Sequence, residues 1–446
     1  MPKLLSISTG VRQLKNSFVP INRLPPEVLG LIPTFRKSER DLISASAVCA
    51  HWRRTLISTP ELWNKIICSR RENPEVVVPR VEAYLKRSGS VPLEVNIHDH
   101  ASQFLSSHTE RILSLRMFLG QTSNLHEIAN HFSKPALLLQ TMSLHVTDAD
   151  RAILHLPSTF FETFLSSVRK LTVRGAILSP GPCKLSQLTK FTLKTRLNRL
   201  SSVVLLDILE EMPLLQFLEA ELNCSDRREP IPGNRVITLS NLEEVAIATD
   251  EDFCAPLASP ILPALCLPSV RRINMHSVRA VGFPSTPILP PSFEERLPRL
   301  SVIPEVSITF GKGFKIKLFG SHQSRLTLST NPALRFLETT FGGTPFDTVR
   351  KLHVRFRRPG GDFAFFFGML RAMERLERLE MKQNTAGPLA YWTAGDERVG
   401  ICPALITLVI TDAKLDEAEH RIRELQQARE RAGIPIPHVE VGVGSD

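Results

Sequence analysis

The chain has 446 residues, of which 42% are hydrophobic and 22% charged, and its formal net charge is +10. This composition excludes an intrinsically disordered chain. The length exceeds the roughly 250–300 residues that one compact core usually holds, so we expect several domains or a repeat array.

Residues 1–20 are predicted to be a flexible lead-in. They and the following Arg23 carry basic residues and no acid, which also fits a mitochondrial transit segment, and that alternative stays open. No apolar run in the chain approaches the eighteen or so residues of a membrane helix. The seven cysteines form no C-x-x-C pair, which indicates free thiols in a reducing compartment, and we expect a cytoplasmic or nuclear protein.

Three short helices are predicted between residues 21 and 68. Pro25 and Pro26 can open the first helix, where a missing amide hydrogen costs nothing. Ser38 and Asp41 have the spacing of a capping box for the second, which we expect to run to about Cys49. The third is expected to end before Pro60.

This segment resembles the F-box, whose pattern is Leu-Pro-x-Glu-x-Leu, a Leu/Ile-rich helix, Val-Cys-x-x-Trp and Pro-x-Leu-Trp. The matching positions are Leu24, Pro25, Glu27, Leu29, Ile32, Leu42, Val48, Cys49, Trp52, Pro60, Leu62 and Trp63. Pro33 and Arg36 depart from the pattern near the end of the first helix.

The resemblance implies a partner, because F-boxes are docking modules for the Skp-type adaptor of cullin-RING ubiquitin ligases. The adaptor-binding residues that it implies are Leu24, Pro25, Ile32, Leu42, Val48, Cys49, Trp52, Leu62 and Trp63. The alternative for each is that it only packs the small bundle, since about forty residues make a limited core.

A short phrase, apolar-x-x-apolar-x-apolar, recurs through residues 69–446. Most copies begin 27 to 29 residues after the previous one, at Ile112, Leu139, Val168, Leu188, Leu215, Leu242, Val270, Ile303, Val349, Leu376 and Leu405. Each copy ends in the period-two alternation of a half-buried strand, and helical patterns such as Phe366, Met369, Leu370 and Met373 lie between copies.

This recurrence resembles an irregular leucine-rich-repeat solenoid, an α/β fold of parallel strands alternating with helices. An F-box before such an array resembles the large F-box families of mushroom-forming fungi. The asparagine that follows the strand in that family occurs only at Asn223 and Asn384, and one long step contains strand-like pieces at 314–319 and 325–330. A helix from Leu415 that halts at Gly433 and a strand at 438–443 are predicted to cap the array.

Charged residues between the strand apolars are predicted to face the concave side in a basic, acidic, basic banding. We expect this surface to bind a protein target of unknown identity, and the alternative is a merely solvated face. The predicted target-binding residues are Arg169, Lys170, Arg174, Lys190, Lys194, Glu219, Glu221, Glu243, Glu244, Arg271, Arg272, Lys351, Arg355 and, on a predicted polar loop, Trp392.

Catalytic and metal-binding motifs are absent from the sequence. It has no phosphate-binding glycine loop, no G-x-S-x-G elbow and no H-E-x-x-H, and His126 and His131 lie five apart, on different faces of a helix. We therefore expect no enzymatic activity, no cofactor and no metal site.

The sequence thus predicts the substrate-recognition subunit of an SCF-type cullin-RING ubiquitin ligase, bound to cullin through the Skp-type adaptor. Two alternatives remain at this point: an F-box scaffold that never promotes degradation, and a nucleic-acid-binding solenoid. The second rests on the net charge of +10, although the basic residues are scattered. No membrane partner is expected.

Overall fold

The computed structural model forms two compact units, Met1–Asp148 with Thr159–Val168, and Ala149–Ser158 with Arg169–Asp446. Each is described by itself. The predicted boundaries at 20 and 68 remain predictions, and both lie inside the first unit. The residues that the structure describes are 11, 14–16, 18–34, 39–69, 72–120, 128, 131, 135–146, 154–156, 167–178, 185–194, 202–222, 235–249, 261, 264–277, 293–300, 302–303, 305–310, 314–320, 325–330, 346–356, 363–394, 396–412 and 415–443.

The first unit begins with helices, as the sequence predicted. A short 3-10 helix, η1 (Pro20–Arg23), precedes α2 (Pro26–Thr34), α3 (Glu39–Ala47) and α4 (Ala50–Ile57), which contact one another pairwise, and η2 (Pro60–Trp63) follows. The second helix ends two residues earlier than expected. Leu29, Leu42 and Leu56 are buried between the helices. The predicted cap at Ser38 lies outside the described residues.

Four parallel strands follow the helices in the first unit. They are β1 (Lys65–Ile67), β2 (Leu93–His98), β3 (Ile112–Leu119) and β4 (Thr141–Val146), paired in that order. Helix α5 (Pro74–Arg87) and the 3-10 helix η3 (Asp99–Arg111) connect the first three. The helix on which His126 and His131 were expected falls mostly outside the described residues.

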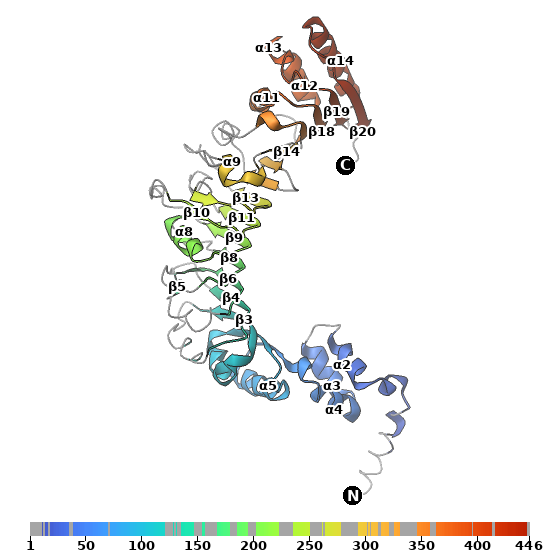
Figure 1. Ribbon diagram of the computed structural model, residues 1–446. Coiled ribbons are helices and arrows are strands. Elements are labelled where there is room, and N and C mark those ends of the chain that lie inside the picture. The colour runs from blue at the N-terminus through green and yellow to red at the C-terminus, as the bar shows by residue number, and fades with distance from the viewer. Residues whose placement is uncertain are drawn as a thin grey trace. The chain divides into compact units, whose positions relative to one another are not determined.

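The second unit starts with parallel strands that pair in sequence order (Figure 1). They are β6 (Lys170–Arg174), β8 (Lys190–Lys194), β9 (Phe217–Leu222), β11 (Glu244–Thr249) and β13 (Arg272–Ser277), with α8 (Ser202–Glu210) before β9. Two small ribbons pair β5 (Leu154–Leu156) with β7 (Ala176–Leu178), and β10 (Ile237–Thr238) with β12 (Leu265–Cys266). The recurring apolar-x-x-apolar-x-apolar phrase therefore correctly predicted these parallel strands.

The order changes at β14 (Glu305–Phe310), β15 (Phe314–Phe319) and β16 (Arg325–Thr330), which follow α9 (Phe293–Arg296) and η5 (Pro298–Leu300). The last of the three, β16, pairs with β13, β15 runs antiparallel between β16 and β14, and β14 pairs with the next repeat strand. The expectation that all strands would be parallel was wrong here, because the chain reverses direction between β14 and β15 and again between β15 and β16. The strand-like pieces predicted at 314–319 and 325–330 are strands.

Parallel strands resume after η7 (Phe346–Thr348) and continue to the end of the unit. They are β17 (Lys351–Phe356), β18 (Arg378–Lys382), β19 (Thr407–Asp412) and β20 (His438–Val443). Helices α11 (Phe363–Arg371), α12 (Ala386–Thr393), α13 (Asp396–Val399) and α14 (Leu415–Arg431) lie between them. The predicted final helix and strand are confirmed, and Gly433 takes the left-handed φ of 66° that ends the helix.

Most of the repeats contain, within the described residues, a turn that the sequence phrase did not include. The backbone amide of the first apolar residue donates to the carbonyl three residues earlier, as in Leu188 to Leu185, Leu215 to Met212 and Leu376 to Met373. All six of these residues are buried. The recurring pattern therefore begins three positions before the phrase, at one further buried residue. This turn comes just before the strand.

Candidate binding surfaces

Residues alternate between two faces along each strand of the second unit. The register aligns buried residues such as Leu171, Phe191 and Leu218 on adjacent strands, where they form the core of the repeats. The residues between them point to the other side, which we call the open face. The target-binding residues predicted within strands lie on this face.

Exposed cations gather on the open face of β6 and β8 and at the residue before β6. Arg169, Lys170, Arg174 and Lys190 are exposed, and we call these four residues the basic patch. The register places Lys170 next to Lys190. The Lys190 ammonium lies 4.2 Å from the ring centroid of Phe217. Among the described residues, no carboxylate pairs with any member of the patch.

The predicted acidic band is partly neutralised by its neighbours. Lys194 Nζ lies 2.6 Å from Glu219 Oε1, and Arg272 Nη2 lies 3.0 Å from Glu244 Oε1. Glu221 is half-buried. The sequence showed the alternation of sign but not these pairs, because the pairs depend on the register between strands. Glu243 and Arg271 are exposed, as expected.

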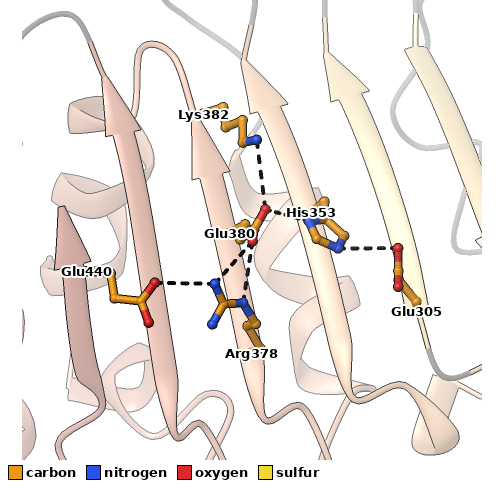
Figure 2. Close-up of polar contacts among 6 residues, drawn as sticks. All are labelled: Glu305, His353, Arg378, Glu380, Lys382 and Glu440. Carbon is orange, nitrogen blue, oxygen red and sulfur yellow. Dashed lines mark hydrogen bonds and ion pairs between the residues drawn. The ribbon is translucent and has the colours of Figure 1, made fainter. Parts of the chain in front are cut away.

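A connected network of charges occupies the open face of β14, β17, β18 and β20. Figure 2 shows Glu380 at its centre, between His353, Arg378 and Lys382. Glu380 Oε2 lies 2.6 Å from His353 Nδ1, and Glu380 Oε1 lies 3.3 Å from Arg378 Nη2. Arg378 also reaches Glu440 at 3.3 Å. This arrangement places each acid beside a base.

The network holds Glu380 in its charged form. Burial alone would raise the pKa of Glu380, but the hydrogen bond and charge of His353, with smaller contributions from Lys382 and Arg378, outweigh burial and lower that pKa below its usual value. The other ring nitrogen of His353, Nε2, lies 3.3 Å from Glu305 Oε1. Because a neutral imidazole has one N–H, only the protonated ring donates to both carboxylates at once.

Other predicted target-binding residues lie around this network. Lys351 is exposed, and Arg355 donates from Nε to Gln383 Oε1 at 3.0 Å. Trp392 was expected on a polar loop as a contact residue, and this expectation was wrong. It lies in α12, is fully buried against Phe367 at a centroid distance of 5.6 Å, and donates from Nε1 to the Arg398 carbonyl.

The final repeat is held together by Arg429 in α14, whose side chain is fully buried. Its guanidinium donates to the carbonyls of Pro435, Val399, Ile401 and Cys402 at 2.9 to 3.3 Å. These bonds tie the last helix to the turns before β19 and β20. The sequence analysis did not identify this residue, since an arginine in an amphipathic helix is ordinarily solvent-exposed.

The helices at residues 21–69 present apolar side chains to solvent. Leu24, Val28, Val48 and Ile57 are exposed, with Val48 at 63%. Of the other predicted adaptor-binding positions, Pro25 is exposed, and Ile32, Cys49 and Leu62 are half-buried. A small domain rarely leaves so much apolar surface exposed without a partner.

Three predicted adaptor-binding residues lie instead in the interior. Leu42, Trp52 and Trp63 are buried in this structure, so their side chains pack the bundle. Trp52 Nε1 donates to Asn22 Oδ1 at 2.6 Å. Trp63 packs its ring edge-on against Tyr84 of α5, with a centroid distance of 5.0 Å. Trp63 therefore joins the three helices to α5 of the same unit.

Metal and membrane sites find no support in the part of the chain that the structure describes. No group of three or more His, Cys, Asp or Glu residues there could hold a metal ion. No described helix is long and apolar enough to cross a membrane. Cys49, Cys266 and Cys402 are free thiols, and His131 Nδ1 lies 2.9 Å from Ser102 Oγ.

Comparison with protein families gives one match. Residues 21–69 match the model of the F-box-like domain, which covers α2, α3, α4, η2 and β1. No curated protein matches the chain. F-box domains generally bind Skp-type adaptors, and the exposed apolar residues described above lie within the matched segment.

Proposed function

We propose that the chain is the substrate-recognition subunit of an SCF-type cullin-RING ubiquitin ligase. The F-box-like domain at residues 21–69 carries this proposal. It would bind a Skp-type adaptor, and through it cullin, while the open face of the repeat strands holds a protein target. The chain itself would contribute no catalysis. Holding the target near a conjugating enzyme would raise the local concentration of its lysines.

The exposed apolar residues of the helices support the adaptor half of the proposal. Leu24 and Val48 were implied as contacts by the F-box pattern, and both are exposed. Apolar groups on the surface of a small bundle gain free energy when a partner covers them. The proposed contact surface includes these residues and leaves out the interior Leu42, Trp52 and Trp63.

Capture by an immobilised Skp-type adaptor tests this half with the full-length chain. A Leu24→Asp, Val48→Asp double variant should lose capture, because each change places a charge in the apolar contact. Ile406→Asp is the matched control, since Ile406 is also exposed, at 63%, but lies before β19 in the other unit. Equal capture of wild type and the double variant would contradict adaptor binding through these residues.

The repeat strands support the target half. The recurrent phrase, the parallel pairing and the bond from Asn384 Nδ2 to the Phe356 carbonyl at 2.8 Å favour a leucine-rich-repeat-like solenoid of the type expanded in mushroom-forming fungi. A location in the cytoplasm or nucleus would follow from this role. Ubiquitination of a co-purified target in a reconstituted complex distinguishes the receptor from an F-box scaffold that leaves its partner unmodified.

A further inference from the structure

The basic patch of β6 and β8 opposes the folding of its own sheet. Adjacent strands are about 4.8 Å apart, so Lys170 and Lys190, which are register neighbours, hold like charges side by side. Arg174 and Lys194 are likewise neighbours. Like charges directly opposite each other on a sheet are destabilising. Only Lys190 has a compensating contact, with the ring of Phe217, so charge pairing within the sheet does not account for Lys170 and Arg174.

Elsewhere on the open face the sequence places opposite charges together. Arg272 faces Glu244, and just before β17 and β18 Arg350 Nη1 lies 3.4 Å from Glu377 Oε1. The network around Glu380 follows the same rule. Opposite charges are thus paired in other parts of this sheet. Lys170, Arg174 and Lys190 have no such carboxylate partner among the described residues, so they are suited to an anionic partner from outside the chain.

We propose that the basic patch binds a short acidic segment of the target protein. This inference rests on the proposed function and names the chemistry of the target. Lys170 and Arg174 are four residues apart on one strand, about 13 Å, so they match side chains of an extended peptide along β6. Lys190 adds a cation beside them on β8. Carboxylates of the peptide would pair with these three residues.

The surroundings of the patch favour a peptide over a nucleic acid. The next strands, β9 and β11, carry Glu219, Glu221 and Glu244 on the open face, and the exposed Glu243 lies just before β11. These acids border the patch, and they would repel a long polyanion that crossed several strands. Tight nucleic-acid binding requires contacts with many phosphates in succession. A patch of two strands accommodates only a few negative groups.

Fluorescence anisotropy with the full-length chain tests the proposal. The probe is a fluorescein-labelled ten-residue peptide of alternating Glu and Ser, with an alternating Gln and Ser peptide as its uncharged match. A Lys170→Gln, Arg174→Gln, Lys190→Gln triple variant should bind the Glu peptide about tenfold more weakly, the combined effect of three exposed charge pairs of ordinary strength.

The control removes three cations from another part of the open face. Arg350→Gln, Lys351→Gln, Lys382→Gln gives the same net charge, and we expect it to change the affinity by less than about twofold. Equal loss in both triple variants, or equal binding of the Glu and Gln peptides, would overturn the proposal.

Two further measurements separate the possible failures. A twelve-nucleotide single-stranded DNA that binds more tightly than the Glu peptide, and loses binding in the same triple variant, would replace the peptide with nucleic acid as the occupant. Capture by the Skp-type adaptor is measured on the same variants. Retained capture without peptide binding refutes the acidic segment alone, whereas lost capture by wild type refutes the proposed function.

Discussion

The two ends of the second unit use the same strand pattern for opposite electrostatic arrangements. On β6 and β8, Lys170 and Lys190 are neighbours of like charge and have no carboxylate partner among the described residues. On β17 and β18, His353, Arg378 and Glu380 form a connected network. The buried residues between them are equivalent, so the difference lies wholly in the exposed positions.

If the proposed function holds, this difference teaches that one part of the open face serves stability and another serves recognition. A network of partly buried pairs contributes to folding and leaves little charge for a partner. Neighbouring exposed cations of like charge oppose folding slightly, but they attract acidic ligands and speed their association. The following predictions test whether the two ends are independent in this way.

The largest effect is expected from Arg429→Met at the paired end. The change leaves four buried carbonyls without their donors, and we expect a loss of about 3–5 kcal/mol in the free energy of unfolding by urea. Arg423→Met is the control, because Arg423 is exposed on the same helix. Unaltered stability of the Arg429 variant would show that water replaces the guanidinium.

Arg429→Met also tests whether the two ends of the second unit are independent of each other. If the two ends are independent, conditions that leave the Arg429 variant folded should leave its affinity for the Glu peptide unchanged. A parallel fall in affinity would show that the basic patch depends on the final repeat.

A smaller effect is expected from Glu380→Gln. The change removes the negative charge and one of the two acceptor oxygens that His353 and Arg378 use, and we expect a loss of about 1–2 kcal/mol, because the pairs are partly exposed. Glu377→Gln is the control, since Glu377 makes a single exposed pair with Arg350. If Glu380→Gln loses no more unfolding free energy than Glu377→Gln, the connected network is no more stabilising than a single exposed pair.

The pH dependence of the Glu380 effect has a definite sign. The folded-state pKa of Glu380 is lowered, so its contribution is present above the ordinary carboxyl pKa and is lost as the pH falls through the folded-state value. We expect the stability difference between wild type and Glu380→Gln to shrink over that acidic range. Urea unfolding at successive pH values measures it, and a difference independent of pH would contradict the charged role.

Sequence reasoning identified local elements well and relations between strands poorly. The F-box pattern and the recurrent phrase depend on nearby residues, so they located α2 to α4 and the strands. The order of β13, β16, β15 and β14 depends on hydrogen bonds between distant segments, which a periodicity does not contain.

For the candidate binding surfaces too, sequence predicted the local features and missed those that depend on contacts between distant segments. Alternation along a strand placed Lys170 and Lys190 on an exposed face, because that rule is local. The pairing of Glu219 with Lys194 required the register, and the burial of Trp392 required the helices that pack over it. Polar residues around Trp392 concealed helix α12, since its buried face is short.

The smallest expected effect has the opposite sign and separates stability from recognition most directly. Lys170→Glu converts the neighbouring pair with Lys190 from like to opposite charge, and we expect stability to rise by about 0.2–0.5 kcal/mol while the Glu peptide binds more weakly. Lys351→Glu is the mirror control, because Lys351 neighbours Glu305 and the change creates a like pair there. Urea unfolding should show the gain at low salt and its loss at about 1 M salt, where screening acts over about 3 Å. A loss of stability in Lys170→Glu would mean that the folded chain already uses this cation, and the patch would then be structural.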